Sequence, residues 1–318
     1  MENQINDLLQ FISERLPNTR FEVIHNSLSP TLKHFIVKDK NGDKGFGTDH
    51  NYPLAIEKAY SEFIERKTFQ ELHRIFGQFK TSNGFAAHID SKRAKQSSIH
   101  ELIERDALLL TWHSKTAPYW LTEDEVKALI LPENLEINSK HKELGLKLNL
   151  GIVAKHKKIL TCIAKVEGKF KSNDFFYIDT KTGTNLSSIL NTLIESISFY
   201  SHYIGLGHLS TNIHRAHKPT QPMDHFYYYL NHSLNVEWFH KGSSEVMEIP
   251  TSKIRNYILK PEEILGGESL KRIVSFSESD MMQSYYCGGF DLKNINLNRF
   301  HQFFGAKMKF NKQLHPLS

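Results

Sequence analysis

The sequence contains the segments GFGTDHNYPLAIEKAYSEFIER at residues 45–66 and GFAAHIDSKRAKQSSIHELIER at residues 84–105. When the chain is shifted by 39 positions, the two segments align without a gap and share seven identical residues in 22 columns. Average residue usage predicts roughly one or two identities over this length. Each copy opens with Gly-Phe and closes with Glu-x-x-Glu-Arg. The duplication therefore predicts that the chain uses one unit twice, a glycine turn followed by a helix.

The residues around the repeat predict both strands and helices. Alternating apolar residues and the turn cluster Lys40-Asn41-Gly42-Asp43 predict a β-hairpin over residues 21–48. Helical spacing of apolar residues predicts one helix from Pro53 to about Leu72 and a second from about Ser91 to Trp112. Three further elements are expected farther along the chain: strands over residues 148–154 and 158–167, and an amphipathic helix over residues 186–204.

No linker rich in Pro, Gly or Ser divides the 318 residues. We therefore expect a single α/β (α+β) domain over residues 1–318, with mixed β-sheets, packed helices and the internal helix repeat. Within this domain, residues 1–20 are expected to form an N-terminal helix, residues 21–112 to carry the duplicated motif and residues 113–318 to form the remainder.

Composition excludes several classes of protein. The chain is 39% hydrophobic and 24% charged, and no apolar run reaches the length of a membrane helix. The polar, slightly acidic start does not resemble a secretory signal, and two cysteines do not form a disulfide framework, so a reducing cytoplasm is expected. The net charge of +5 is not gathered into Lys/Arg blocks. We therefore expect neither a nucleic-acid nor a membrane partner.

The repeated Glu-x-x-Glu-Arg carries the chemistry. Residues three apart share a helix face, so each copy presents two carboxylates side by side, and the Arg can pair with the first of them. The residues concerned are Glu62, Glu65 and Arg66 in the first copy and Glu101, Glu104 and Arg105 in the second. If the two helices pack together, four carboxylates and two guanidiniums surround one cleft.

Four carboxylates in one cleft repel one another and require a compensating cation. Hard oxygen ligands suit Mg²⁺, which usually accompanies phosphate groups, and arginine binds phosphate through two parallel hydrogen bonds. The sequence has no GxxxxGK[ST] motif, so we expect an ATP–Mg²⁺ site on helix faces. The alternative is a solvated helix face with local ion pairs, which is the usual role of a single such motif.

These residues carry a resemblance to a known family. Thr81–Ala87 followed by Glu101–Ala107 resembles the signature segment of the YcaO superfamily, and Gly45–Gly47 with Ser61–Arg66 resembles its first ATP-site motif. Asp224-His225-x-x-Tyr228 is similar to a DHxxxY-type segment of the azoline-forming members. Leu314-His315-Pro316-Leu317-Ser318 resembles the proline-rich tail of those members.

The resemblance implies ATP-dependent activation of peptide backbone amides to give thiazolines and oxazolines, or thioamides and amidines in some relatives. It implies metal binding by Glu62, Glu65, Glu101 and Glu104, with ATP and Mg²⁺ as cofactors. It further implies nucleotide binding by Arg66, Ser82, Asn83, Gly84 and Arg105, although Ser82-Asn83-Gly84 could also be an ordinary strand-to-helix turn. The candidates for a direct role in the chemistry are Glu195, His315, Pro316 and Ser318.

The resemblance also implies partners. A ribosomally synthesised precursor peptide is the expected substrate, and a separate leader-peptide-binding protein is expected to present it. A flavin-dependent dehydrogenase and a homodimer are further expectations. Four positions depart from the family pattern, where Lys58, Arg93, Ser97 and His88 replace the usual residues. These departures leave open a second interpretation, a non-catalytic docking subunit of a peptide-modifying complex.

Overall fold

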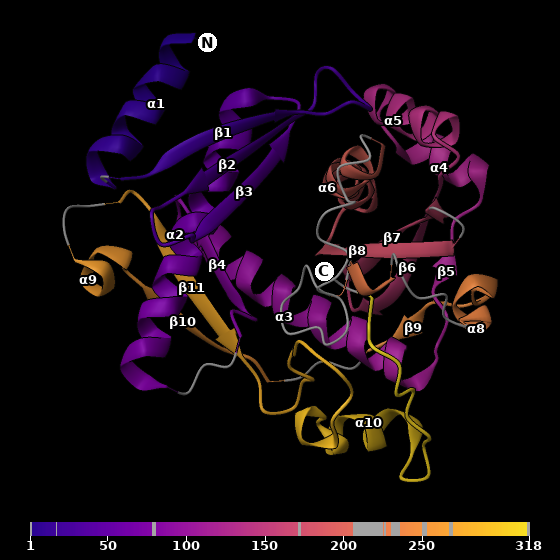
Figure 1. Cartoon of the computed structure of the whole chain (residues 1–318). Coiled ribbons are helices and arrows are strands. Elements are labelled where there is room, and N and C mark those ends of the chain that lie inside the picture. Colours follow the sequence, from indigo (N-terminus) through magenta and orange to yellow (C-terminus); the bar gives the residue numbers. More distant parts are fainter. Residues whose placement is uncertain are drawn as a thin grey trace. The chain divides into compact units, whose positions relative to one another are not determined.

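The computed structural model describes residues 2–16, 18–77, 81–170, 173–205, 225, 227–229, 236–249, 253–266 and 270–316 (Figure 1). Its contacts divide the chain into two compact units. Unit 1 consists of Met1–Leu102 and Ile254–Glu278, and unit 2 consists of Ile103–Lys253 and Ser279–Ser318. Helix α3 (Ser91–Ser114) begins in the first unit and ends in the second.

Unit 1 contains two three-stranded antiparallel sheets and the helices packed on them. One sheet has the order β1-β2-β3 and the other the order β10-β11-β4. The elements besides α3 are α1 (Glu2–Arg15), β1 (Arg20–His25), β2 (Lys33–Lys38), β3 (Lys44–Asp49), α2 (Tyr52–Phe76), β4 (Phe85–His88), β10 (Arg255–Leu259), α9 (Pro261–Leu265) and β11 (Ile273–Glu278). The expected β-structure over residues 21–48 is thus confirmed, but it has three strands and not two, because β3 lies in the last part of this range.

The sequence repeat corresponds to a structural repeat. Helix α2 begins at Tyr52 and α3 begins at Ser91, so the two helices start 39 residues apart, the same shift that aligns the sequences. Each helix follows a strand that begins at or beside the repeated Gly-Phe. The two strands join different sheets, because β3 pairs with β2 whereas β4 pairs with β11.

Helix α2 begins and ends with standard capping residues and forms much of the core of unit 1. The side chain of Asn51 accepts a hydrogen bond from the Leu54 N–H, Pro53 occupies the first turn, and Gly77 ends the helix in a left-handed conformation. The buried apolar residues of α2 pack with neighbours from α1, β2 and β4, including Ile12, Phe35 and Phe85.

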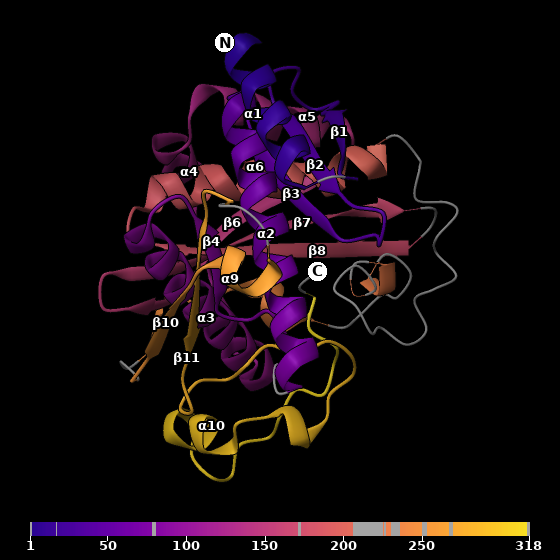
Figure 2. The ribbon, with the colours of Figure 1, turned by 90° about the vertical axis from the view of Figure 1, so that its left-hand side faces the viewer.

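Unit 2 is built around one antiparallel sheet with the order β5-β6-β7-β8, to which β9 adds in parallel beside β6 (Figures 1 and 2). Helix α6 packs against β7 and β8. The elements are β5 (Tyr119–Trp120), α4 (Glu123–Leu129), α5 (Pro132–Glu143), β6 (Lys147–His156), β7 (Ile159–Phe170), β8 (Asn173–Gly183), α6 (Leu186–Gly205), α8 (Glu237–Lys241), β9 (Met247–Glu248), a 3₁₀ turn (Leu292–Asn294) and α10 (Leu297–Phe304). The predicted strand pair and helix 186–204 are confirmed.

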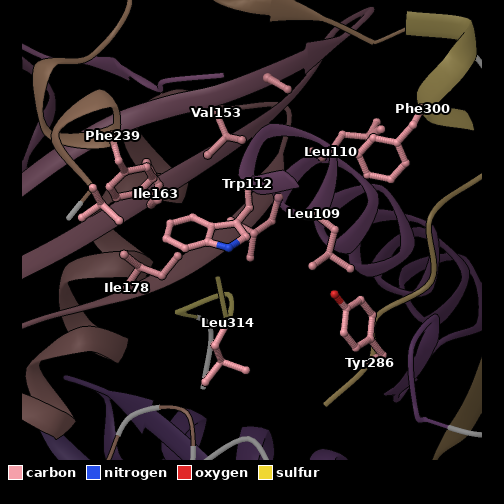
Figure 3. Packing of buried hydrophobic residues seen from close by; sticks show 14 of the residues in the cluster. Leu109, Leu110, Trp112, Val153, Ile163, Ile178, Phe239, Tyr286, Phe300 and Leu314 are labelled. Atoms are coloured by element: carbon pink, nitrogen blue, oxygen red, sulfur yellow. The ribbon is translucent and has the colours of Figure 1, made fainter. Parts of the chain in front are cut away.

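The core of unit 2 gathers around Trp112, near the end of α3 (Figure 3). The cluster gathers side chains from the sheet, α8 and α10: Phe239 packs edge-on against the indole ring, while Phe300 lies beside Leu110. The indole N–H donates a hydrogen bond to the carbonyl oxygen of Gln313 at 3.1 Å. The C-terminal segment is therefore part of this core rather than a loose extension.

The mixed α/β architecture expected from the sequence is confirmed. Within the described ranges, no helix has both the length and the apolar character needed to cross a bilayer.

Two buried histidines make unit 2 sensitive to acid. His113 donates from Nδ1 to the carbonyl oxygen of Asn311 at 2.8 Å, and its Nε2 accepts from the Tyr286 hydroxyl at 2.8 Å. His141 has an equivalent pair of partners in Ile137 and Ser201. Both rings are neutral in these networks, because each bonds a carbonyl through one nitrogen and a hydroxyl through the other. Burial lowers the pKa of His113 and of His141 to about 4.

We predict that the free energy of unfolding falls as the pH is lowered from 7.5 to 5. The unfolded chain takes up a proton near pH 6.5, whereas folded His113 does so near pH 4, so stability is lost between these values. Each histidine contributes a loss of about 2 kcal/mol at pH 5. Urea unfolding of His113→Gln at both pH values measures this contribution. An unchanged pH dependence in this variant would contradict the assignment.

Candidate functional site

Two glycines let strand β3 lie directly on helix α2. A Cβ atom at Gly45 would overlap the carbonyl oxygen of Ala59, and one at Gly47 would overlap that of Ala55. No side chain fits at either position. The close approach brings the backbone N–H of Phe46 to the Oε2 atom of Glu62, at 2.8 Å. The Gly-Phe-Gly sequence is thus explained by the contact that positions the first acid of the motif.

Arg66 completes the environment of Glu62. Its Nη2 lies 2.5 Å from Oε1 of Glu62, the helical pairing expected from their spacing of four residues. The same guanidinium donates to the carbonyl oxygen of Lys44 at 3.1 Å and lies over the Phe46 ring. Glu62 is therefore a carboxylate with satisfied partners, held between α2 and β3.

Glu65 is in a different electrostatic environment. Its carboxylate accepts a hydrogen bond from the backbone N–H of Ala87, on strand β4 of the second copy. Burial, the charge of Glu101 and the charge of Glu62 together raise the pKa of Glu65 well above its usual value, and Arg66 only partly opposes them. Unit 1 therefore places Glu65 within the electrostatic influence of both Glu62 and Glu101, and all three acids remain partly accessible to solvent.

The donor set of this acid cluster suits Mg²⁺ rather than a transition metal. It offers hard carboxylate oxygens and no sulfur or imidazole. In the described part of the chain, no three His, Cys, Asp or Glu side chains are arranged closely enough to hold a metal ion by themselves. Mg²⁺ typically binds one or two carboxylates and completes its coordination with water and substrate phosphates. The residues present therefore fit a metal that arrives with a nucleotide.

The two cationic departures from the family pattern are paired elsewhere. Lys58 donates from Nζ to the carbonyl oxygen of Thr48 at 2.9 Å and lies 2.8 Å from Asp49. Arg93 lies 3.5 Å from Asp90, at the start of α3, and its side chain is largely exposed. Neither charge is among the main influences on the pKa of Glu65. Ser97, the third departure, is exposed.

The loop Ser82-Asn83-Gly84 forms a tight turn before β4. Gly84 has φ +81°, and its carbonyl oxygen accepts from the Ser277 N–H at 2.8 Å. The N–H of Phe85 donates to the carbonyl oxygen of Ser82 at 3.0 Å. The Oδ1 atom of Asn83 is buried and has no hydrogen-bond partner among the described residues. A role of this loop in nucleotide binding stays a prediction.

Glu104 and Arg105 belong to unit 2. Glu104 is 4% exposed and accepts a hydrogen bond from the Thr180 hydroxyl at 3.1 Å, while Arg105 Nη1 lies 3.4 Å away. Burial raises the pKa of Glu104, and the charges of Lys181 and Arg105 oppose this effect. The guanidinium of Arg105 lies over the Tyr285 ring, 5.2 Å from its centre. That Glu104 acts together with the acids of unit 1 stays a prediction.

Two of the remaining candidates, Glu195 and His315, form hydrogen bonds within unit 2. Glu195 accepts from the Asn134 side chain at 3.3 Å, a contact between α6 and α5. His315 is buried, donates from Nε2 to the Tyr286 carbonyl oxygen at 2.8 Å and offers its own carbonyl oxygen to His225. Pro316 is also buried. Ser318 lies outside the described residues, as do Asp224 and Leu317 of the quoted family segments. A direct role in the chemistry stays a prediction for all of these.

Sequence reasoning missed two partners of the predicted acids. The backbone of Ala87 contacts Glu65, and the hydroxyl of Thr180 contacts Glu104. The repeat carried a signal for Ala87, since it follows the second Gly-Phe, but no signal marked Thr180. Its strand, β8, was not expected at all.

The comparisons with known proteins concern the family and the fold. Residues 70–150 match the family model described as "YcaO cyclodehydratase, ATP-ad Mg2+-binding". None of the curated protein sequences matches the chain. The sequence resemblance to YcaO proteins is thus confirmed over the segment that contains the second Glu-x-x-Glu-Arg.

Solved structures are similar over nearly the whole chain. A heterocyclase in complex with substrate and cofactor matches with a TM-score of 0.66 and 8% identity over 99% of this chain, which spans 57% of the heterocyclase's length. YcaO from Methanopyrus kandleri, bound with AMPPCP and Mg²⁺, matches with a TM-score of 0.61 and 11% identity over 100% of this chain and 96% of that one. The E. coli microcin synthetase McbBCD complex matches with a TM-score of 0.61 and 13% identity over 94% and 96%. The expected YcaO-like fold is confirmed.

We predict that Glu65→Gln stabilises the metal-free protein. The folded-state pKa of Glu65 is raised, so the ionised acid costs stability at every pH above about 4.5, and a neutral amide removes this cost. Gln also retains the acceptor for the Ala87 N–H. Urea unfolding at pH 7.5 without Mg²⁺ should show a higher free energy of unfolding than that of the native chain.

Glu62→Gln is the matched control for this measurement, because it removes an acid that is paired with Arg66. This variant should lose stability. If Glu65→Gln destabilises the protein as much as Glu62→Gln does, the Glu65 carboxylate is a structural partner and not an acid held ready for a cation.

Proposed function

We propose that the chain is an ATP- and Mg²⁺-dependent cyclodehydratase subunit that activates backbone amides of a precursor peptide. A Cys, Ser or Thr side chain of the peptide then closes on the activated carbonyl carbon and gives a thiazoline or oxazoline ring. The observation that carries this proposal is the cluster of Glu62, Glu65 and Glu101, in which burial and then repulsion by the two other acids raise the pKa of Glu65. A cation bound there relieves the repulsion.

Each acid has a distinct part in this proposal. Glu62 is held by Arg66 and the Phe46 N–H, so it offers a fixed carboxylate. Glu65 and Glu101 supply the excess negative charge that attracts a divalent cation. Glu104, with one oxygen held by Thr180, is proposed as a further metal ligand. Fixed charges of this kind act by positioning and neutralising phosphate groups rather than by covalent chemistry.

The nucleotide would be held by groups of opposite charge. We propose Arg66 and Arg105 as phosphate-binding cations and the turn Ser82-Asn83-Gly84 as a backbone contact for the nucleotide. ATP supplies the phosphoryl group that takes up the amide oxygen and departs with it as phosphate. Ring formation therefore removes one water from the peptide overall, with ATP consumed. The family model that matches residues 70–150 is described in terms of ATP and Mg²⁺, which supports this assignment.

The proposal includes partners. A ribosomally made precursor peptide is the proposed substrate, and a leader-binding protein is proposed to present it. The similarity in fold to a subunit of the McbBCD complex, which is also known with pro-MccB17 bound, supports both. A flavin-dependent dehydrogenase that oxidises the rings and a homodimer of this chain extend the same proposal.

A non-catalytic docking subunit is the second candidate. The observation that favours it is that Lys58 and Arg93 replace the residues usual in the family pattern. The two candidates differ in ATP consumption, since a docking subunit modifies no amide and hydrolyses no nucleotide. Thioamide or amidine formation is a third outcome, in which the amide oxygen is replaced and no ring closes.

We predict that incubation of the chain with ATP, Mg²⁺, its partner protein and a Cys/Ser/Thr-containing precursor removes the mass of one water per ring. Mass spectrometry of the peptide measures this loss. Glu65→Gln should abolish it, because the variant removes a proposed metal ligand but keeps the hydrogen bond to Ala87. Glu71→Gln is the control on the same helix, since Glu71 pairs locally with Arg74.

The control variant should retain the activity of the native chain. Replacement of oxygen by sulfur in the product would instead identify a thioamide-forming enzyme. An unmodified peptide and unconsumed ATP with the native chain would support the docking subunit.

A further inference from the structure

Glu104 is a buried acid whose carboxylate contacts protein hydrogen-bond donors through only one of its two oxygen atoms. The residue is 4% exposed. The Thr180 hydroxyl donates to its Oε1 at 3.1 Å, and Arg105 Nη1 lies 3.4 Å from the same atom. Over the ranges that the structure describes, no hydrogen bond or ion pair reaches the second oxygen, Oε2. The arrangement leaves one acceptor of a buried carboxylate for a group outside the protein.

Burying most of the Glu104 carboxylate lowers the stability of the ligand-free protein. A buried carboxylate loses its hydration and is normally compensated at both oxygens. Burial is the largest influence on the pKa of Glu104 and raises it, despite the nearby charges of Lys181 and Arg105. Among the described residues, Oε2 is not one of the buried atoms that lack a partner, so it is open to solvent and a ligand can reach it.

Thr180 is well suited to hold the first oxygen. It is fully buried on strand β8, where it pairs with Ile163 of β7. Its backbone N–H donates to the Asp179 carboxylate at 2.8 Å. The branched Cβ restricts the side-chain rotamer, and the paired strand restricts the backbone. The hydroxyl therefore reaches Glu104 from a rigid support in the sheet.

We propose that Thr180 is a positioning residue for the nucleotide-associated metal: its hydroxyl fixes Oε1 of Glu104 so that Oε2 is available to Mg²⁺. This inference rests on the proposed function and concerns Glu104 and strand β8, which both belong to unit 2. It is specific to the hydroxyl group. The methyl group of Thr180 serves packing, so replacing the hydroxyl alone separates the two roles.

The test compares Thr180→Val, which keeps the shape and removes the hydroxyl, with Thr180→Ser, which keeps the hydroxyl. ATP binding is measured by isothermal titration calorimetry over a series of Mg²⁺ concentrations. We expect Thr180→Val to need about tenfold more Mg²⁺ for half-maximal ATP affinity, because a charge-assisted hydrogen bond is lost. Thr180→Ser should stay within about twofold of the native chain.

A matched control is available on the neighbouring strand. Thr161 is equally buried on β7, and its hydroxyl contacts the Thr182 hydroxyl at 2.9 Å rather than an acid. Thr161→Val removes a buried hydroxyl from the same sheet and should leave the Mg²⁺ dependence unchanged. Should Thr180→Val fail to fold, Thr180→Cys supplies a weaker donor of similar size and should fall between Ser and Val.

The outcomes separate this inference from the proposed function. If the native chain binds ATP with Mg²⁺ and Glu104→Gln weakens this binding, but Thr180→Val does not, the positioning role is overturned and the function stands. Equal weakening by Val and Ser overturns it as well, since only packing would then matter. A native chain that binds no ATP at any Mg²⁺ concentration overturns both.

Discussion

The close packing of strand β3 on helix α2 is the constraint on which unit 1 depends. Gly45 and Gly47 have no side chains, so the strand backbone lies against the carbonyl groups of the helix. This contact places the Phe46 N–H on the carboxylate of Glu62 and leaves Arg66 to span the same helix and strand. A larger residue at either glycine would separate β3 from α2 and release the first acid of the motif.

One acid of unit 1 carries an electrostatic cost that the fold does not relieve. Glu62 is paired, but burial, and after it the charges of Glu101 and Glu62, raise the pKa of Glu65. Proteins usually separate or pair such acids, and sites that retain the repulsion commonly exchange stability for ligand binding. The two cations that replace family residues, Lys58 and Arg93, pair with aspartates and do not remove this cost.

Helical spacing and the repeat are sufficient to predict α2, α3 and the acids they carry, because periodic apolar residues and a duplicated motif are local signals. The sequence does not predict β3 as a separate strand, because glycine has a low strand propensity. Its two glycines are explained only by the contact with α2. Thr180 escapes for a different reason, since it lies 76 residues from Glu104 and no local pattern links the two. Tertiary contacts decide which acids meet. The prediction that Glu104 lies beside the other three acids rests on sequence spacing alone.

The most direct measurement is anomalous X-ray diffraction from crystals grown with Mn²⁺, as a substitute for Mg²⁺, and a non-hydrolysable ATP analogue. The account predicts an anomalous peak within coordination distance of the Glu65 and Glu101 carboxylates, next to the phosphates of the analogue. It also predicts that the peak is absent from crystals of Glu65→Gln grown under the same conditions. A nucleotide bound elsewhere, or a metal ion that has no contact with these acids, would contradict the account.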